Sequence, residues 1–86
     1  MANNSITQTI LTILTILTMA TERGPDKTVC PSEVARALFP TNWRKHMQDL
    51  RDAAIELQKG GKVSITQKGQ PVNVEHIKGP IRIKIN

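Results

Sequence analysis

Glycine and proline interrupt this chain at four places, besides a turn at residues 68–71, and so limit the lengths of helix and strand that it can form. Proline cannot continue a helix, and glycine is favoured just beyond a helix end. With 86 residues, the chain has room for one domain and a modest core. We expect a single domain over residues 5–86, after a disordered start at residues 1–4. The interruptions are Gly24-Pro25, Phe39-Pro40, Gly60-Gly61 and Gly79-Pro80.

The segment before the first interruption has the spacing of a helix. Its apolar residues follow one another at intervals of four and three, with Leu14 beside them. Ile and Thr both favour strands, but a half-buried strand would need strict alternation, which is absent. We therefore predict a helix over residues 5–23. The residues expected to face the core are Ile6, Ile10, Ile13, Leu17 and Ala20.

A short second helix is predicted to begin at Pro31. Proline fits the first helical position because its missing N–H would have no helical partner there. Glu33 follows in the first turn, where the helix dipole favours an acidic side chain. The buried face is predicted to consist of Val34, Ala35 and Leu38.

A third helix is predicted over residues 42–59, with Thr41 or Asn42 as its cap. Its apolar residues again lie at intervals of four and three. The chain has one Trp, one Phe and no Tyr, so we expect Trp43 to be the largest single piece of the core. The residues of this stripe are Trp43, Met47, Leu50, Ala54 and Leu57.

Alternating residues replace the helical spacing after residue 61. Val63 and Ile65 share one face of a predicted strand, and residues 81, 83 and 85 share one face of another. Residues 68–71 have turn chemistry, while residues 72–80 fit no single element. The order of elements predicts an α+β fold, a winged helix-turn-helix with three helices and a small antiparallel β-hairpin as the wing.

Several stretches also resemble a catalogued bacterial family of domains of unknown function. The likeness extends from about residue 10 to residue 85, and it implies a small winged-helix protein. Members can occur beside a short cysteine-rich module, which this chain lacks. The resemblance implies no activity. The stretches are residues 23–38 (RGPDKTVCPSEVARAL), Trp43-Arg44, residues 66–72 (TQKGQPV) and residues 79–82 (GPIR).

The charge of the chain favours a polyanionic partner. Its formal net charge is +5, and residues 57–86 carry six Lys and Arg residues against one Glu. A basic surface attracts phosphates, although a basic solvated surface without such a partner is the competing interpretation. The low aromatic content argues against a stacking platform for single strands. We therefore expect double-stranded DNA as the partner of a possible transcriptional regulator.

Four residues of the third predicted helix are candidates for contacting DNA. Arg44, Gln48 and Arg51 lie at intervals of four and three, with Lys45 beside them. In a helix-turn-helix the second helix of the motif enters the major groove, where Arg can bind guanine and Gln can bind adenine. The competing interpretation is a solvated helix face that carries a Lys45–Asp49 pair.

Two further observations bear on this interface. Asp49, Asp52 and Glu56 form a neighbouring acidic stripe, which counts against deep insertion into a groove. The candidates in and near the wing would hold phosphates without reading sequence. Cations on an exposed strand can instead serve to prevent aggregation at the sheet edge. The wing candidates are Lys68, Lys78 and Arg82.

Other classes of function have little support in the sequence. Cys30, His46 and His76 lack the spacing of a metal site, so we expect no cofactor, no metal and no enzyme activity. The apolar run at residues 6–20 is short, rich in Thr and without a preceding cation, which predicts neither a membrane helix nor a signal peptide. A single cysteine suits the cytoplasm.

The alternative hypothesis is a protein-interaction module without nucleic acid. The N-terminal helix carries more Ile and Leu than an 86-residue core is expected to cover. The surplus apolar surface could pair with a second copy of the chain or with another protein.

Overall fold

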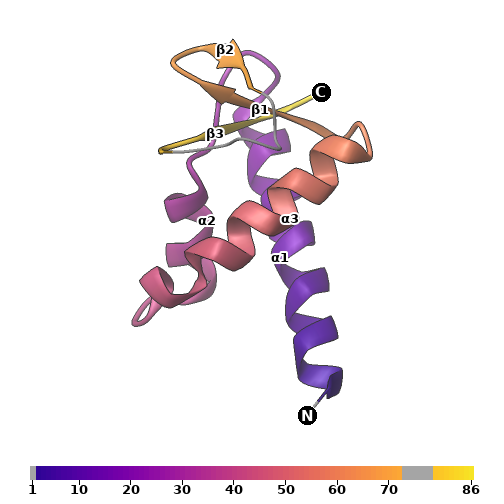
Figure 1. The fold of residues 1–86 in the computed structure, drawn as a ribbon, viewed down its shortest axis with the longest axis vertical. Coiled ribbons are helices and arrows are strands. Elements are labelled where there is room, and N and C mark those ends of the chain that lie inside the picture. The colour runs from indigo at the N-terminus through magenta and orange to yellow at the C-terminus, as the bar shows by residue number, and fades with distance from the viewer. Residues whose placement is uncertain (1, 73–78) are drawn as a thin grey trace.

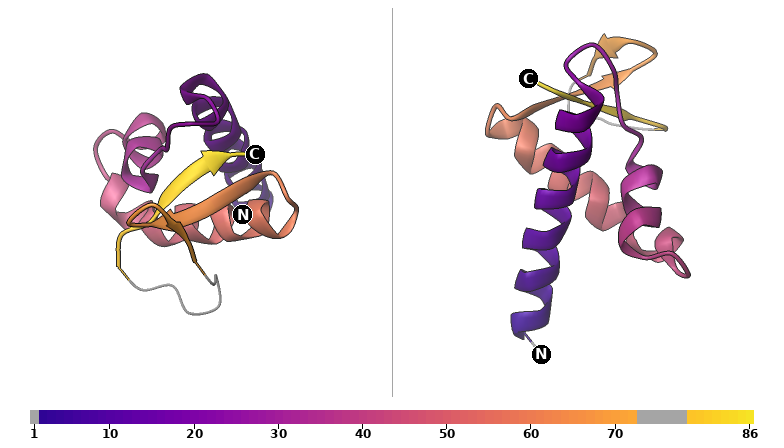
Figure 2. Two further views of the ribbon diagram at one scale, coloured as in Figure 1. Left: turned by 90° about the horizontal axis from the view of Figure 1, so that it is seen from above. Right: turned by 180° about the vertical axis from the view of Figure 1, so that it is seen from behind.

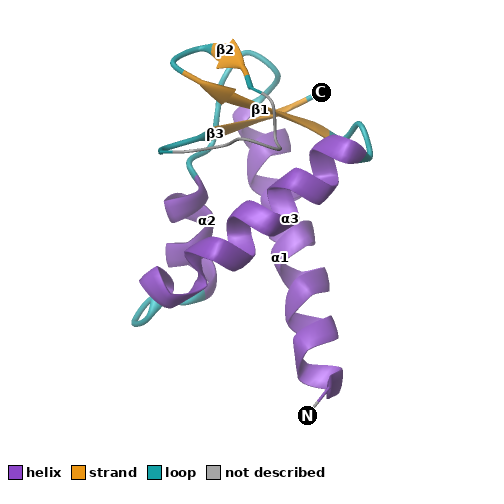
Figure 3. Cartoon of the chain, viewed as in Figure 1, coloured by secondary structure: helices purple, strands orange, loops and turns teal. Residues whose placement is uncertain are grey.

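The fold is α+β, with helices in the first two thirds of the chain and strands in the last third (Figures 1 and 3). The computed structural model describes residues 2–72 and 79–86, with side chains described from Thr7 onward. None of the described helices is long and apolar enough to cross a membrane. The elements are α1 (Ala2–Arg23), α2 (Pro31–Leu38), the 3-10 turn η1 (Trp43–His46), α3 (Met47–Lys59), β1 (Val63–Gln67), β2 (Gln70–Pro71) and β3 (Arg82–Ile85).

The strands form one antiparallel sheet in the order β2-β1-β3, and we call this sheet the wing. It lies across one end of the three helices (Figures 1 and 2). Val29, between α1 and α2, adds a bridge to Ile83 through hydrogen bonds of 2.7 and 2.8 Å. The loop before α2 is thus fixed to β3. The arrangement is consistent with a winged helix, as the order of elements predicts.

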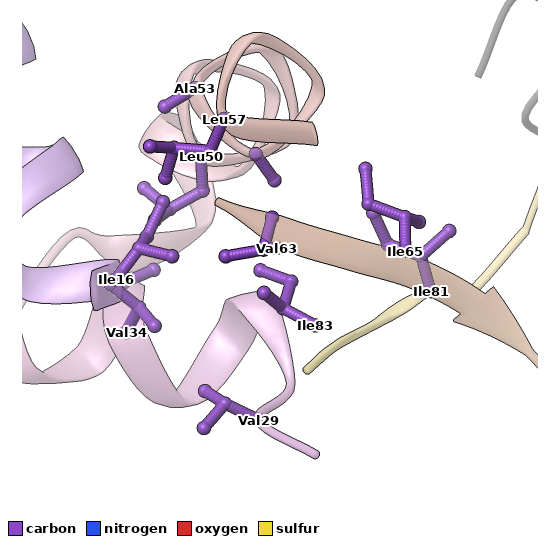
Figure 4. Packing of buried hydrophobic residues seen from close by; sticks show 12 residues of the cluster. Ile16, Val29, Val34, Leu50, Ala53, Leu57, Val63, Ile65, Ile81 and Ile83 are labelled. Carbon is purple, nitrogen blue, oxygen red and sulfur yellow. The ribbon is translucent and has the colours of Figure 1, made fainter. Parts of the chain in front are cut away.

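The core lies between the wing and the helices (Figure 4). The prediction that Trp43 is the largest piece of the core is wrong. The residue lies half-buried at the edge of the core. The reason is its place at the start of η1, where two arginines cover the ring instead of apolar side chains. Aliphatic side chains fill the centre. The largest fully buried ones are Ile16, Leu50, Ile65, Ile81, Ile83, Val29, Val34 and Val63.

The first helix begins earlier than predicted. Helical structure starts at Ala2 rather than at Ser5. No glycine or proline lies among the first 23 residues, so nothing in the sequence forces a later start. Met1 and the side chain of Ile6 lie outside the described residues.

The buried face of α1 also differs from the predicted one. Ile10 and Leu14 are exposed, whereas Thr12, Ile16 and Ala20 are buried. The Ile-Leu-Thr repetition places apolar side chains all around the helix, so periodicity alone cannot select the inner face. Thr12 tolerates burial because its hydroxyl donates to the Gln8 carbonyl oxygen at 2.8 Å. The half-buried apolar side chains beside this face are Ile13, Leu17 and Met19.

The third helix is not continuous from residue 42. Trp43–His46 form a 3-10 turn, and the α-helix begins at Met47. Asn42 occupies the cap position without a side-chain hydrogen bond. A 3-10 turn has three residues per turn rather than 3.6, so the predicted stripe does not continue from Arg44 into α3 with α-helical spacing.

Candidate nucleic-acid interface

The segment that precedes α3 is built around the half-buried ring of Trp43. The guanidinium carbon of Arg44 lies 4.5 Å from the ring centroid, and that of Arg36, in the last turn of α2, lies at the same distance. Cations above an indole face are attracted by its electron density. Lys45 is exposed next in the chain. Two cations therefore meet on the Trp43 ring where α2 and η1 come together, and Lys45 adds an exposed cation in η1.

A second ring pair fixes the end of η1. The rings of Phe39 and His46 stack with centroids 3.6 Å apart and planes inclined by 14°. The side chain of Gln8 on α1 donates to Nδ1 of His46 at 3.1 Å. The carboxylate of Asp49 lies 3.6 Å from the same nitrogen. The predicted Lys45–Asp49 pair is absent from the ion pairs of the described residues, and Asp49 lies beside His46 instead, because the 3-10 turn changes which residue faces Asp49.

On α3, the two predicted contact residues already have intramolecular partners. The amide of Gln48 donates to the carboxylate of Asp52 at 2.9 Å on the same helix. The guanidinium of Arg51 donates to the carbonyl oxygen of Gly79 at 3.0 Å, just before β3. A guanidinium has five N–H donors, so Arg51 keeps others for a ligand. The α3 helix and the end of the loop that leads into β3 are thus joined directly.

The acidic side chains of α3 line a cleft against α1. This cleft has a volume of about 490 Å³ and is bounded by Asp49, Asp52 and Glu56 of α3 and by Gln8 and Thr12 of α1. The acidic stripe therefore borders the α1 side of α3, whereas Arg51 reaches the wing side. Arg51 and the acidic stripe thus occupy different flanks of α3, while Lys59 in its last turn pairs with Glu56 at 3.5 Å.

In the wing, Lys68 is an exposed cation at the turn between β1 and β2. Its φ is 51° and that of Gly69 is 79°, so both residues of this two-residue turn are left-handed. Arg82 does not join this turn; its Nε donates to the hydroxyl of Thr28 at 2.9 Å. Lys78 lies outside the described residues.

Arg82 contributes positive charge to a charged cluster at the start of α2. The Cys30 N–H donates to Glu33 at 2.7 Å, and Arg23 lies 3.3 Å from the same carboxylate. The Cys30 hydrogen bond is the main cause that lowers the pKa of Glu33 below its ordinary 4.5. Burial opposes it, and the hydrogen bond and charge of Arg23, with the charge of Arg82 last, lower the pKa further. Arg82 therefore supports the cap of α2.

The position of Cys30 is explained by its neighbours and by its place at the start of α2. Its sulfur lies 3.1 Å from the Ser32 hydroxyl, and it occupies the cap position of α2. Within the described residues, no three His, Cys, Asp or Glu side chains gather as metal ligands. His76 lies outside that part of the chain.

Comparison with known proteins places the chain in a family. The family model described as a protein of unknown function (DUF3253) matches residues 9–86. The chain belongs to the DUF3253 family. No curated protein matches the sequence. The DUF3253 match covers α2, η1, α3 and the wing, so every candidate contact residue lies inside the family domain.

Two groups in this DUF3253 domain were not identified from sequence. Arg36 lies seven residues before Trp43 and on the other side of a proline break, so helical spacing gives no sign that they meet. The Gly79 carbonyl is a backbone group, which residue chemistry does not reveal. The one sequence feature that could have identified Arg36 as a candidate is its position as a cation in the last turn of α2.

Proposed function

We propose that this DUF3253 domain binds double-stranded DNA, with η1 and α3 against the major groove and the wing turn against the backbone. The proposal rests on the position of the cations in a winged-helix-like arrangement, because a fold by itself does not specify function. A DNA-binding domain with one free cysteine suits a regulator of transcription that works in the reducing cytoplasm.

The Arg51–Gly79 hydrogen bond is the observation that carries the proposal. It joins the second turn of α3 to the residue at which the chain returns to the wing. A winged helix needs its helix and wing held in a fixed relation if both are to contact one duplex. Lys45 and Lys68 are exposed cations with no ion pair among the described residues, so they are available for phosphates.

The distribution of negative charge favours the same orientation. Asp49 and Glu56 border the cleft against α1, on the flank of α3 away from Arg51. The flank of α3 that carries Arg51 is therefore the one away from the acidic cleft, which suits an approaching polyanion. Gln48 is the weakest of the candidates, because binding adenine would require its amide to leave Asp52.

Salt titration of duplex binding tests the proposal. The probe is a short random-sequence duplex carrying a fluorophore, and the readout is anisotropy at increasing salt. Four cations on phosphates give a slope of about −3 to −4 in log K against log salt. The Arg44→Ala/Lys45→Ala variant is expected to have a shallower slope than a Lys62→Ala/Lys84→Ala control, which loses the same charge. Absence of binding at micromolar protein in low salt would refute the proposal.

Self-association through α1 is a second candidate function, and a specific observation favours it. Ile10, Leu11 and Leu14 are the large apolar side chains that the described part of the chain leaves exposed, at 54%, 53% and 55%. They lie within five residues of one another near the middle of α1. The N-terminal end of this helix projects beyond the other helices, away from the wing (Figures 1 and 2).

The chemistry of this face selects a second copy of the chain as its partner. Residues 2–21 contain no Asp, Glu, Lys or Arg, so the helix offers nothing that would attract a charged partner. An identical helix is equally uncharged and brings the same apolar side chains, as a two-fold symmetric interface requires. Thr15 does not oppose such packing, because its hydroxyl already donates to the Leu11 carbonyl oxygen at 2.8 Å.

A further inference from the structure

Two arginines from different elements share one tryptophan ring, and together these residues form what we call the Arg–Trp–Arg cluster. Arg36 comes from α2 and Arg44 from η1, and each guanidinium carbon lies 4.5 Å from the centroid of Trp43. The two positive groups therefore lie within about twice that distance of each other. The helix-turn-helix connection between them makes this meeting a property of the fold rather than of neighbouring sequence.

The charges of the Arg–Trp–Arg cluster are not neutralised within the described chain. Of the ion pairs there, none involves Arg36 or Arg44. Both side chains are exposed. Two like charges this close repel each other, and the attraction of the ring offsets that repulsion only in part. An anion in contact with both groups would offset the repulsion and accept hydrogen bonds from both.

We propose that the Arg–Trp–Arg cluster binds a phosphate group of the DNA backbone. Arg36 is then a contact residue in addition to the predicted stripe of Arg44, Gln48 and Arg51. This inference rests on the proposed function. Guanidinium groups match phosphate oxygens through paired N–H donors. Stacking on Trp43 holds both groups before DNA arrives, so less side-chain freedom is lost on binding. The cluster fixes the position of the domain on the duplex and reads no base.

Trp43 supplies a direct readout, because it is the one tryptophan in the sequence. A phosphate that draws the two guanidinium groups away from the ring must alter the indole emission. The experiment titrates the full chain with the short random-sequence duplex and follows Trp43 fluorescence together with the affinity. The variants are Arg36→Ala and Arg36→Lys, and the control is Lys62→Ala, which removes one exposed charge beyond the far end of α3.

The expected result is that DNA changes the emission of Trp43 and that Arg36→Ala weakens binding about tenfold and lowers the salt slope by about 1. Arg36→Lys is expected to recover the slope but only part of the affinity, since a lysine lacks the planar stacked group. Lys62→Ala should change the affinity less than threefold. Circular dichroism verifies that each variant is folded, and Arg36→Lys serves as the test if Arg36→Ala is not.

Two results would overturn the inference, and they are distinguishable. If the wild type binds DNA with steep salt dependence while Arg36→Ala and Lys62→Ala lose equal affinity and Trp43 emission stays constant, the cluster is not a phosphate site and the proposed function stands. If the wild type binds no DNA, both fall together.

Discussion

The guanidinium of Arg51 and the carbonyl oxygen of Gly79 lie 3.0 Å apart, joined by a hydrogen bond that spans 28 residues of sequence. This bond ties the second turn of α3 to the backbone just before β3. A second bond acts at the same place, since the Gln67 side chain donates to the Pro80 carbonyl oxygen at 3.0 Å. Side chains from α3 and from β1 thus hold one short stretch of backbone, and the position of the wing depends on both.

Replacing Arg51 with alanine is expected to loosen this connection. The lost hydrogen bond comes from a charged group but is exposed to solvent, so we expect the free energy of unfolding to fall by about 1 kcal/mol. Duplex affinity should fall by more than this stability change would cause, because Arg51 also contributes a positive charge. Urea unfolding and anisotropy titration measure the two effects. Amide NMR shifts should move at Gly79.

Gln48→Ala is the matched control for that prediction. Among the described residues its side chain bonds only Asp52 on the same helix, so removing it should leave the wing in place and the Gly79 shift unchanged. Equal shifts at Gly79 in both variants would contradict the connection.

The cap of α2 should make stability depend on pH. The Cys30 N–H and the charges of Arg23 and Arg82 lower the pKa of Glu33 in the folded state. A lowered folded-state pKa stabilises the protein above the ordinary Glu value of 4.5, and this stabilisation disappears as pH falls through the lowered pKa. We expect Glu33→Gln to cost about 0.5–1 kcal/mol at neutral pH, with partial solvent exposure keeping the loss small. The measurement is urea unfolding from neutral to acid pH.

Glu22→Gln serves as the control, since Glu22 is an exposed acid in α1 with no ion pair in the described structure. Its unfolding curve should follow the wild type at every pH. The cap explanation fails if Glu33→Gln and wild type differ equally at neutral pH and below the lowered pKa.

Local chemistry predicts well where several helices, strands and turns of this fold begin and end. Pro31 does begin α2 and Glu33 does lie in its first turn. The turn predicted over residues 68–71 is confirmed at Lys68-Gly69, whereas Gln70-Pro71 form strand β2, which the sequence does not predict. The confirmed features depend on a few adjacent residues, so sequence alone specifies them. The α+β class follows from the same breaks, since they separate helical spacing from alternation.

Features that depend on distant partners were predicted poorly. The inner face of α1 was misplaced because Ile10 and Ile16 are equally apolar, and only packing against α3 and the wing distinguishes them. Trp43 was assigned to the core because of its size, although the ring lies where Arg36 reaches it from another helix. The roles of Arg51 and Arg82 likewise depend on partners 28 and 54 residues away.

Introducing a charge on the exposed face of α1 tests self-association. Leu14→Lys is expected to make the chain monomeric at concentrations where the wild type is a dimer, because a lysine opposite its own symmetry mate would be desolvated and repelled. Stability of the monomer should stay within about 0.5 kcal/mol, since Leu14 is 55% exposed. Sedimentation equilibrium measures the mass. Thr21→Lys, an exposed change in the last turn of α1, should remain dimeric; a wild type that is monomeric at all concentrations would refute the interface.

A single methyl group added at Gly69 should lower the stability of the Lys68-Gly69 turn through backbone conformation alone. Gly69 has a φ of 79°, and a side chain there would meet no atom within 4 Å, so Gly69→Ala introduces strain without a clash. We expect a loss of about 1 kcal/mol in urea unfolding, and less for Gly69→Asn, because asparagine tolerates the left-handed region better. Gly60→Ala is the control: it adds a methyl group at a φ of −80° and at ordinary contact, 3.6 Å from the Glu56 carbonyl oxygen. It should be neutral or stabilising. Equal stability of Gly69→Ala and wild type would show that the turn adopts another conformation.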